Sequence, residues 1–168
     1  KELSLESVKA EIYARNNPTL TPVDIEIHAE VVYRILELKK KHNAVILGNN
    51  YMEPLVFGLS NQSEQGDSLA LSMSAAEAES EFIIFNGVRF MAETAKVLNP
   101  SKRVLIADKS AGCSLADDFG AEEVRILKEK YPGVPVMSYI NSYADAKAEC
   151  DVGCTSANAE KIAMVVPG

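Results

Sequence analysis

Short apolar runs alternate with helical patterns along most of the chain, and this alternation restricts the possible fold more than any other feature. The apolar runs have the length and composition of buried strands: AVILG (44–48), FIIFNGV (82–88), RVLIADK (103–109), VPVMSYINS (134–142) and DVGCTS (151–156). Helical patterns follow them at 66–79, 90–99, 122–131, 143–149 and 158–166. Because strands that alternate with helices form parallel sheets covered by helices, the sequence predicts an α/β fold built from three-layer parallel-sheet units.

The N-terminal part, residues 1–43, reads as helices that lead into the first unit. The clearest helix is expected over 19–43, where Thr21 is a favourable N-cap and Pro22 suits the first helical position. Its apolar residues at helical spacing are Ile27, Val31, Ile35 and Leu38.

The remaining chain divides into a first α/β unit, residues 44–118, and a second unit, residues 119–168. The two units echo each other weakly, because each puts a tyrosine and an asparagine where its leading strand ends. The second unit offers only two strands against three in the first. We therefore expect the second unit to be incomplete and to need further sequence or another polypeptide.

Composition excludes several classes of function. The net charge is −7, whereas a nucleic-acid binder would carry a basic stripe. No apolar run approaches the roughly 20 residues of a membrane span, and no targeting segment is visible. The 3 cysteines are an odd number without a secretion signal, which argues against a disulfide framework. We expect a cytoplasmic protein that acts on small molecules, not on nucleic acid or a membrane.

Polar residues follow the strands at the edge where open parallel sheets bind ligands. Asn49 and Tyr51 follow the first strand, Tyr139 and Asn141 end a later one, and Ser156 follows the last. Amides and hydroxyls can hold carboxylate or carbonyl oxygens, and a phenol can act as a general acid or base. Such residues can also simply cap strands and start helices, but three clusters at equivalent strand ends favour a binding crevice.

Two helix starts carry further candidates. Ser68 lies in the first turn of a helix, where free N–H groups can bind an anion, although serine is also a common cap there. Cys113 precedes a helix, which would stabilise its thiolate; it could be a nucleophile, a metal ligand or a structural residue. Cys150 and Cys154 have a C-x3-C spacing, unlike the C-x2-C of common zinc sites, and we expect them to be structural.

The segments LGNNYMEP, GDSL, GVRFMAETAKVLNP, AGCSLADD, SYINSYADAKAECD and CTSANA resemble, in wording and spacing, the quinolinate synthase family. The likeness runs from about Ala44 to Ala159. It implies three pseudo-symmetric α/β units around a central [4Fe–4S] cluster, which three cysteines hold and whose open iron acts as a Lewis acid. The implied reaction condenses iminoaspartate with dihydroxyacetone phosphate to quinolinate, for NAD biosynthesis.

The resemblance also implies roles for single residues. Cys113 matches the first cluster ligand, and Tyr51 resembles the tyrosine of the acid–base steps. The residues implied to bind the substrate are Asn49, Ser68, Tyr139, Ile140, Asn141 and Ser156. Cys150 and Cys154 match no ligand position.

Two departures from the family pattern keep alternatives open. Asn49 stands where the family usually has histidine, so this position can hydrogen-bond but cannot titrate near neutral pH. Cys113 is also a single thiolate, whereas the cluster takes three, so further sequence, a partner chain or a homo-oligomer must supply the others. The alternatives are a diverged relative with changed chemistry and a cluster-free module that binds a small dicarboxylate or phosphate.

Overall fold

The computed structural model of the chain describes residues 2–16 and 20–166. The helices in these residues are α1 (Leu5–Asn16), α2 (Pro22–Lys41), α3 (Pro54–Phe57), the 3-10 turn η1 (Gln62–Glu64), α4 (Ser68–Glu77), α5 (Arg89–Leu98), α6 (Ser114–Asp117), α7 (Ala121–Lys130), α8 (Ala144–Glu149) and α9 (Ala159–Val165). The strands are β1 (Val45–Asn49), β2 (Gln65–Gly66), β3 (Phe82–Asn86), β4 (Arg103–Ile106), β5 (Met137–Tyr139) and β6 (Val152–Cys154).

The strands form two parallel sheets. The first is 4-stranded with the order β2-β1-β3-β4, and the second is the 2-stranded pair β5-β6. All pairings are parallel, with Val45 opposite Ile83 in the first sheet and Met137 opposite Val152 in the second. The predicted α/β class with parallel sheets is confirmed.

Side chains of the central strands alternate between the two faces of the first sheet, as the twofold period of a strand requires. Leu47, Ile83 and Phe85 are fully buried in a cluster with side chains of α4 and α5. Their neighbours Ile46 and Ile84 line the opposite face, on the side of α2. Burial on both faces explains why these strands read as continuous apolar runs.

The face toward α2 is only partly covered. A groove of about 610 Å³ runs along it, with Ile35 and Leu38 of α2 on one side and Phe82 and Leu105 of the sheet on the other. Leu105 is 48% exposed. The β4 side of this face is therefore an open apolar surface of the first unit.

Helix α2 begins as its sequence predicts. Thr21 is the N-cap: its hydroxyl accepts a hydrogen bond from the Asp24 amide at 3.2 Å, and the Asp24 carboxylate accepts one from the Thr21 amide at 2.9 Å. This reciprocal capping box satisfies two N–H groups that the first turn would leave unpaired. Residue 19, where the helix was expected to begin, lies outside the described residues.

The buried face of α2 is not the stripe of apolar residues noted in the sequence. Ile25, Ala29 and Val32 are buried against α1, whereas Ile27 and Val31 are 63% and 57% exposed. Helical spacing identifies a helix but not the side that packs, because α1 selects the face it contacts. The buried face and the exposed apolar face of α2 differ only in whether α1 covers them.

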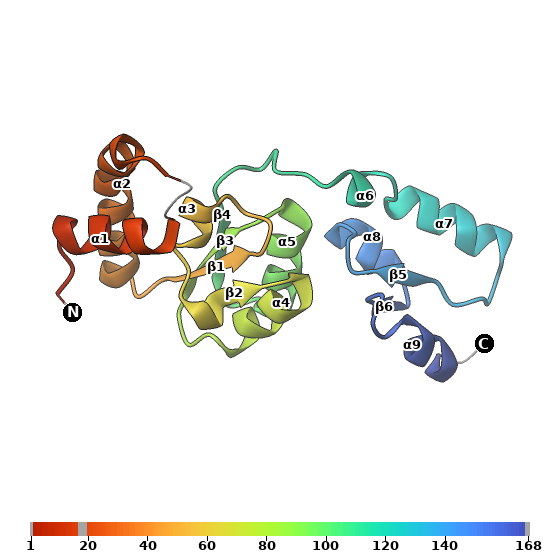
Figure 1. Cartoon of the computed structure of the whole chain (residues 1–168). Coiled ribbons are helices and arrows are strands. Elements are labelled where there is room, and N and C mark those ends of the chain that lie inside the picture. The colour runs from red at the N-terminus through yellow and green to blue at the C-terminus, as the bar shows by residue number, and fades with distance from the viewer. Residues whose placement is uncertain (1, 17–19, 167–168) are drawn as a thin grey trace.

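The second unit, α7 to α9 with β5 and β6, lies at the other end of the molecule from α1 and α2, after an extended connection and α6, which follow β4 (Figure 1). It contacts the first unit through α8 and α5: the Glu93 carboxylate accepts a hydrogen bond from the Ala144 amide at 2.7 Å, and the Lys147 ammonium donates one to the Thr94 hydroxyl at 2.9 Å. The exact boundaries 43/44 and 118/119 stay a prediction.

Elements of the loop after β1 were not predicted from the sequence. The segment VFGLSNQSEQ contains the end of α3, the turn η1 and the start of the two-residue strand β2, which pairs with Gly48 and Asn49 of β1. Strands this short carry no period that a sequence pattern could reveal. No described helix combines the length and the hydropathy that crossing a bilayer requires.

Candidate active site

Asn49 ends β1 and is buried, with 2% of its surface exposed. Its side-chain oxygen accepts a hydrogen bond from the Tyr51 amide at 3.2 Å, and its side-chain nitrogen lies 3.5 Å from the Met91 sulfur. The first contact is an Asx turn, in which the side chain takes over a backbone partner and turns the chain out of the sheet. The asparagine at the strand end therefore aims the chain that carries Tyr51.

Tyr51 reaches back over the same edge of the sheet. The residue is 60% exposed, and its hydroxyl lies 3.8 Å from the Met91 sulfur. Partial burial of the phenol, followed by the nearby Cys113 thiol, raises the pKa of Tyr51 above its ordinary value, while the Val88 amide opposes that shift. A phenol is protonated at neutral pH with its ordinary pKa already, so the Tyr51 hydroxyl is in the form that can donate a proton.

Cys113 lies in the connection between β4 and α6, where it is the N-cap of α6. Its carbonyl accepts hydrogen bonds from the Ala116 and Asp117 amides at 2.8 and 2.9 Å. The thiol is free and half-buried, and the side chain packs against the edge of the main apolar cluster. The cluster that Cys113 packs against contains Met91, whose sulfur lies 3.8 Å from the Tyr51 hydroxyl, so both side chains belong to the same edge of the sheet.

A buried tyrosine lies behind the Cys113 loop. The Tyr143 hydroxyl donates to Asp117 Oδ1 at 2.6 Å, and the Arg89 guanidinium lies 3.8 Å from the centre of the Tyr143 ring. The hydrogen bond to Asp117, followed by burial, raises the pKa of Tyr143, whereas the Cys113 amide acts in the opposite direction. The Tyr143 hydroxyl thus contacts the loop that carries Cys113.

The sequence-predicted residues of the second unit form a separate group. Ile140 lines a hollow of about 400 Å³ between the two units, together with Leu69 and Thr155, the neighbours of Ser68 and Ser156. Lys147 lines the same hollow, and burial lowers its pKa from 10.5 to about 8, against the effect of the Glu93 carboxylate. The starts of α4 and α9 thus come to one hollow at the end of β5.

The remaining candidates do not line this hollow themselves, but each is next in sequence to a residue that does. Ser68 is the first residue of α4, directly after the N-cap Asp67, and is half-buried. Tyr139 ends β5 and is 41% exposed, Asn141 follows in a bend, and Ser156 lies exposed in a turn. In the described part of the chain, no recorded hydrogen bond joins these residues to Asn49, Tyr51 or Cys113. Their substrate-binding roles, and that of Asn49, stay predictions.

The described residues contain no group of three His, Cys, Asp or Glu side chains placed to hold a metal ion. Cys113 fits as one ligand, because its free thiol is half-buried beside a polar strand edge. Cys154 is buried in β6, and Cys150 is half-buried at the end of α8. A [4Fe–4S] cluster would take further ligands from outside these residues.

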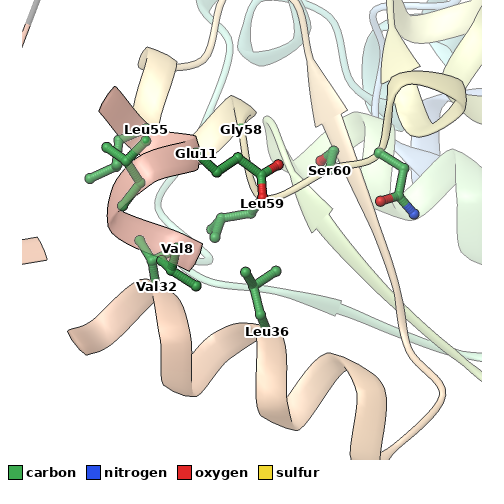
Figure 2. A pocket seen from close by; sticks show the side chains of 10 residues that line it. Val8, Glu11, Val32, Leu36, Leu55, Gly58, Leu59 and Ser60 are labelled. Atoms are coloured by element: carbon green, nitrogen blue, oxygen red, sulfur yellow. The ribbon is translucent and has the colours of Figure 1, made fainter. Parts of the chain in front are cut away.

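A further hollow, of about 150 Å³, lies between α1, α2 and the segment that follows α3 (Figure 2). Aliphatic side chains line most of it, among them Val8, Val32, Leu36 and Leu55. It contains none of the predicted site residues. Its lining is that of a packing gap between the N-terminal helices and the first unit, not of a site for a dicarboxylate.

Sequence reasoning missed side chains that take part in the site. The Met91 sulfur contacts the side chains of both Asn49 and Tyr51. Tyr143 contacts the loop that carries Cys113, and Lys147 lines the hollow at the end of β5. Each lies inside a helical pattern or next to one, where a core residue and a site residue look alike. Only the packing of α5 and α8 brings them to the strand ends.

Comparison with known proteins agrees with the resemblance in the sequence. A family model described as "Quinolinate synthetase A protein" matches residues 33–167. The chain is 48% identical over 151 residues to "Quinolinate synthase 2" of Mesorhizobium japonicum, covering 90% of the chain and 46% of that relative. It is 45% identical over 159 residues to "Quinolinate synthase" of Caulobacter vibrioides, covering 94% of the chain and 43% of the relative.

A relative from Agrobacterium fabrum, also named "Quinolinate synthase", is 53% identical over 132 residues, which are 78% of the chain and 38% of the relative. The chain thus spans less than half the length of these curated relatives. The family-model match, over residues 33–167, includes every predicted site residue. The chain therefore belongs to the quinolinate synthase family.

Proposed function

We propose that this chain forms part of a cytoplasmic quinolinate synthase, which condenses iminoaspartate with dihydroxyacetone phosphate to quinolinate in NAD biosynthesis. The observation that carries the proposal is the meeting of Asn49, Tyr51 and Cys113 at one edge of the first sheet, in a chain of this family. Further ligands for the [4Fe–4S] cluster come from further sequence, from a partner chain or from a second copy.

Cys113 is the ligand that this chain contributes to the cluster, which, when bound, supplies an iron that acts as a Lewis acid toward the substrate. Tyr51 Oη carries the proton for the acid–base steps, because a phenol is protonated at neutral pH and the hydroxyl lies at the strand edge. Asn49 orients Tyr51 through the hydrogen bond from the Tyr51 amide.

The second group of residues binds the substrate. Ser68, Tyr139, Asn141 and Ser156 offer hydroxyl and amide groups to carboxylate oxygens, and Ile140 provides an apolar wall of the hollow between the units. Both groups lie at ends of parallel strands or at helix starts next to them, where sheets of this type hold ligands.

The decisive experiment is anaerobic reconstitution of the complete assembly that contains this chain, followed by iron and sulfide counting and an assay for quinolinate. The proposal expects about four iron atoms per assembled site, as a cubane requires, and quinolinate formed from both substrates. Stable binding of a dicarboxylate without iron and without product would contradict it and support a cluster-free binding module.

Asn49 favours a second candidate, a diverged relative with altered chemistry on the same scaffold. The side chain cannot titrate near neutral pH, and it is buried against Met91. Asn49→His distinguishes the two. If the position moves a proton in quinolinate synthesis, the variant gains activity, by up to the roughly 10²–10⁴-fold that general acid–base catalysis contributes. If quinolinate is not formed by either protein while iron is bound, the altered chemistry is supported.

A further inference from the structure

We propose that Tyr143 is a positioning residue that fixes the loop bearing Cys113, so that the thiol, as a ligand, is held in a single orientation. The inference rests on the proposed role of Cys113 as a cluster ligand. Tyr143 lies in the second unit, directly before α8, and matched none of the site positions implied by the sequence.

The Tyr143 hydroxyl holds both ends of the short helix α6. It donates to Asp117 Oδ1, at the end of α6, at 2.6 Å. The amide of Cys113, the N-cap of α6, points at the hydroxyl oxygen of Tyr143 itself. The loop also passes close by at Gly112, where an added Cβ would lie 3.5 Å from Tyr143 Oη. One hydroxyl therefore ties down the residues on both sides of the thiol.

The α6 segment needs such an external contact. It contains 4 residues, far fewer than a helix requires to be stable by itself, and the connection before it runs outside the sheet. Its own capping bonds come from the backbone, because Cys113 provides no side-chain cap. On its other side the loop is held by the hydrogen bond from the Arg89 amide to the Ala111 carbonyl at 2.8 Å, two residues before the thiol. Tyr143 adds the contact that reaches α6 itself.

Tyr143 is well placed to be that partner because it is itself immobilised. It is 8% exposed and belongs to the main apolar cluster. The Arg89 guanidinium lies over its ring, and Arg89 pairs with Glu93 at 3.1 Å. Glu93 in turn accepts a hydrogen bond from the amide of Ala144, the residue after Tyr143. These contacts connect the Cys113 loop to α5, which packs on the first sheet.

A metal site tolerates little freedom in its ligands, because a productive geometry has to be held within about half an ångström by the groups behind the ligands. Tyr143→Phe keeps the packed ring and removes only the hydroxyl. Asp117→Ala removes the partner from the other side and leaves Tyr143 packed. The two variants should therefore change the site in the same way, and Tyr131→Phe, at a half-exposed tyrosine of the same unit, is the matched control.

Two measurements on the complete assembly test the proposal. In cluster-free protein, hydrogen exchange of the peptide spanning 110–118 should become roughly three- to tenfold faster in Tyr143→Phe and in Asp117→Ala, the factor expected for one lost hydrogen bond. In reconstituted protein, the electron paramagnetic resonance spectrum and the reduction potential of the cluster should shift in both variants. Tyr131→Phe should match the unmodified protein in both measurements.

Unchanged hydrogen exchange at 110–118 in the two variants overturns the proposal. Faster exchange with an unchanged cluster spectrum and reduction potential also overturns it, because Tyr143 would then support the loop without orienting the Cys113 thiol. Failure of the proposed function has a different signature, since the unmodified assembly itself would bind no iron. In that case, the exchange measurement alone decides whether Tyr143 holds the Cys113 loop.

Discussion

Lys147 provides the most informative test of how the two units meet. Its ammonium donates hydrogen bonds to the Thr94 hydroxyl and to the Ser142 carbonyl, and it lies 5.6 Å from the centre of the Phe90 ring. Burial at this contact lowers the pKa of Lys147 from 10.5 to about 8, while the Glu93 carboxylate acts against that shift. Lys147 should therefore contribute a part of its own to the dependence of the chain's stability on alkaline pH.

The sign follows from which state binds the proton. Between about pH 8 and 10.5 the unfolded chain protonates Lys147 and the folded chain does not, so the free energy of unfolding rises with pH across that window. Below about pH 8 both states carry the proton, and the burial penalty is present in full. The whole shift corresponds to roughly 3 kcal/mol, and solvent access to the half-buried ammonium reduces the expected rise to about 1–2 kcal/mol.

The assay compares urea unfolding at pH 7.5 and pH 10 for the unmodified chain and for Lys147→Met, which keeps most of the aliphatic stem. Tyrosine and cysteine groups titrate in both proteins, so the difference between their pH dependences isolates Lys147. Lys161→Met, at an exposed lysine, controls for the loss of one positive charge. Equal pH dependence in the unmodified chain and Lys147→Met would refute the reasoning and show that the ammonium is hydrated at the contact.

Further substitutions test the core, the site and the N-terminal helices. Phe85→Ala should lower the free energy of unfolding by about 3–5 kcal/mol because Phe85 is fully buried, whereas Leu105→Ala, on the open face, should lower it by only about 1 kcal/mol; equal losses in urea unfolding would contradict the assignment of the two faces. Cys113→Ser should abolish iron binding in the reconstituted assembly and Cys150→Ser should not, and iron counting would expose the reverse pattern. Thr21→Ala should cost about 1 kcal/mol through the lost capping box, and an unchanged urea midpoint would argue against that cap.

Local patterns in the sequence predicted much of the fold correctly. The runs at 44–48 and 82–88 became the buried strands β1 and β3, because a strand covered on both faces has to be apolar on both. Thr21 and Pro22 predicted where α2 begins, because a cap acts on the turn next to it. The motifs around Asn49 and Cys113 identified the family, which the comparisons then confirmed.

Other features depended on contacts between distant residues. Nothing local distinguishes the buried Ile25 from the exposed Ile27, because α1 decides which face of α2 is covered. Nor does the sequence show that β2 exists, since its pairing with β1 is the only thing that makes two residues a strand.

The sequence by itself thus determined the class of fold, the family and the chemistry available at the strand ends. Only the tertiary structure brought Tyr51 beside Cys113, and Tyr143 of the second unit beneath the loop of the first. The physical reason is the separation along the sequence over which each interaction acts. Strand periods, caps and motifs act over a few residues. The packing of α5 against the sheet and of α8 against α5 joins segments more than twenty residues apart.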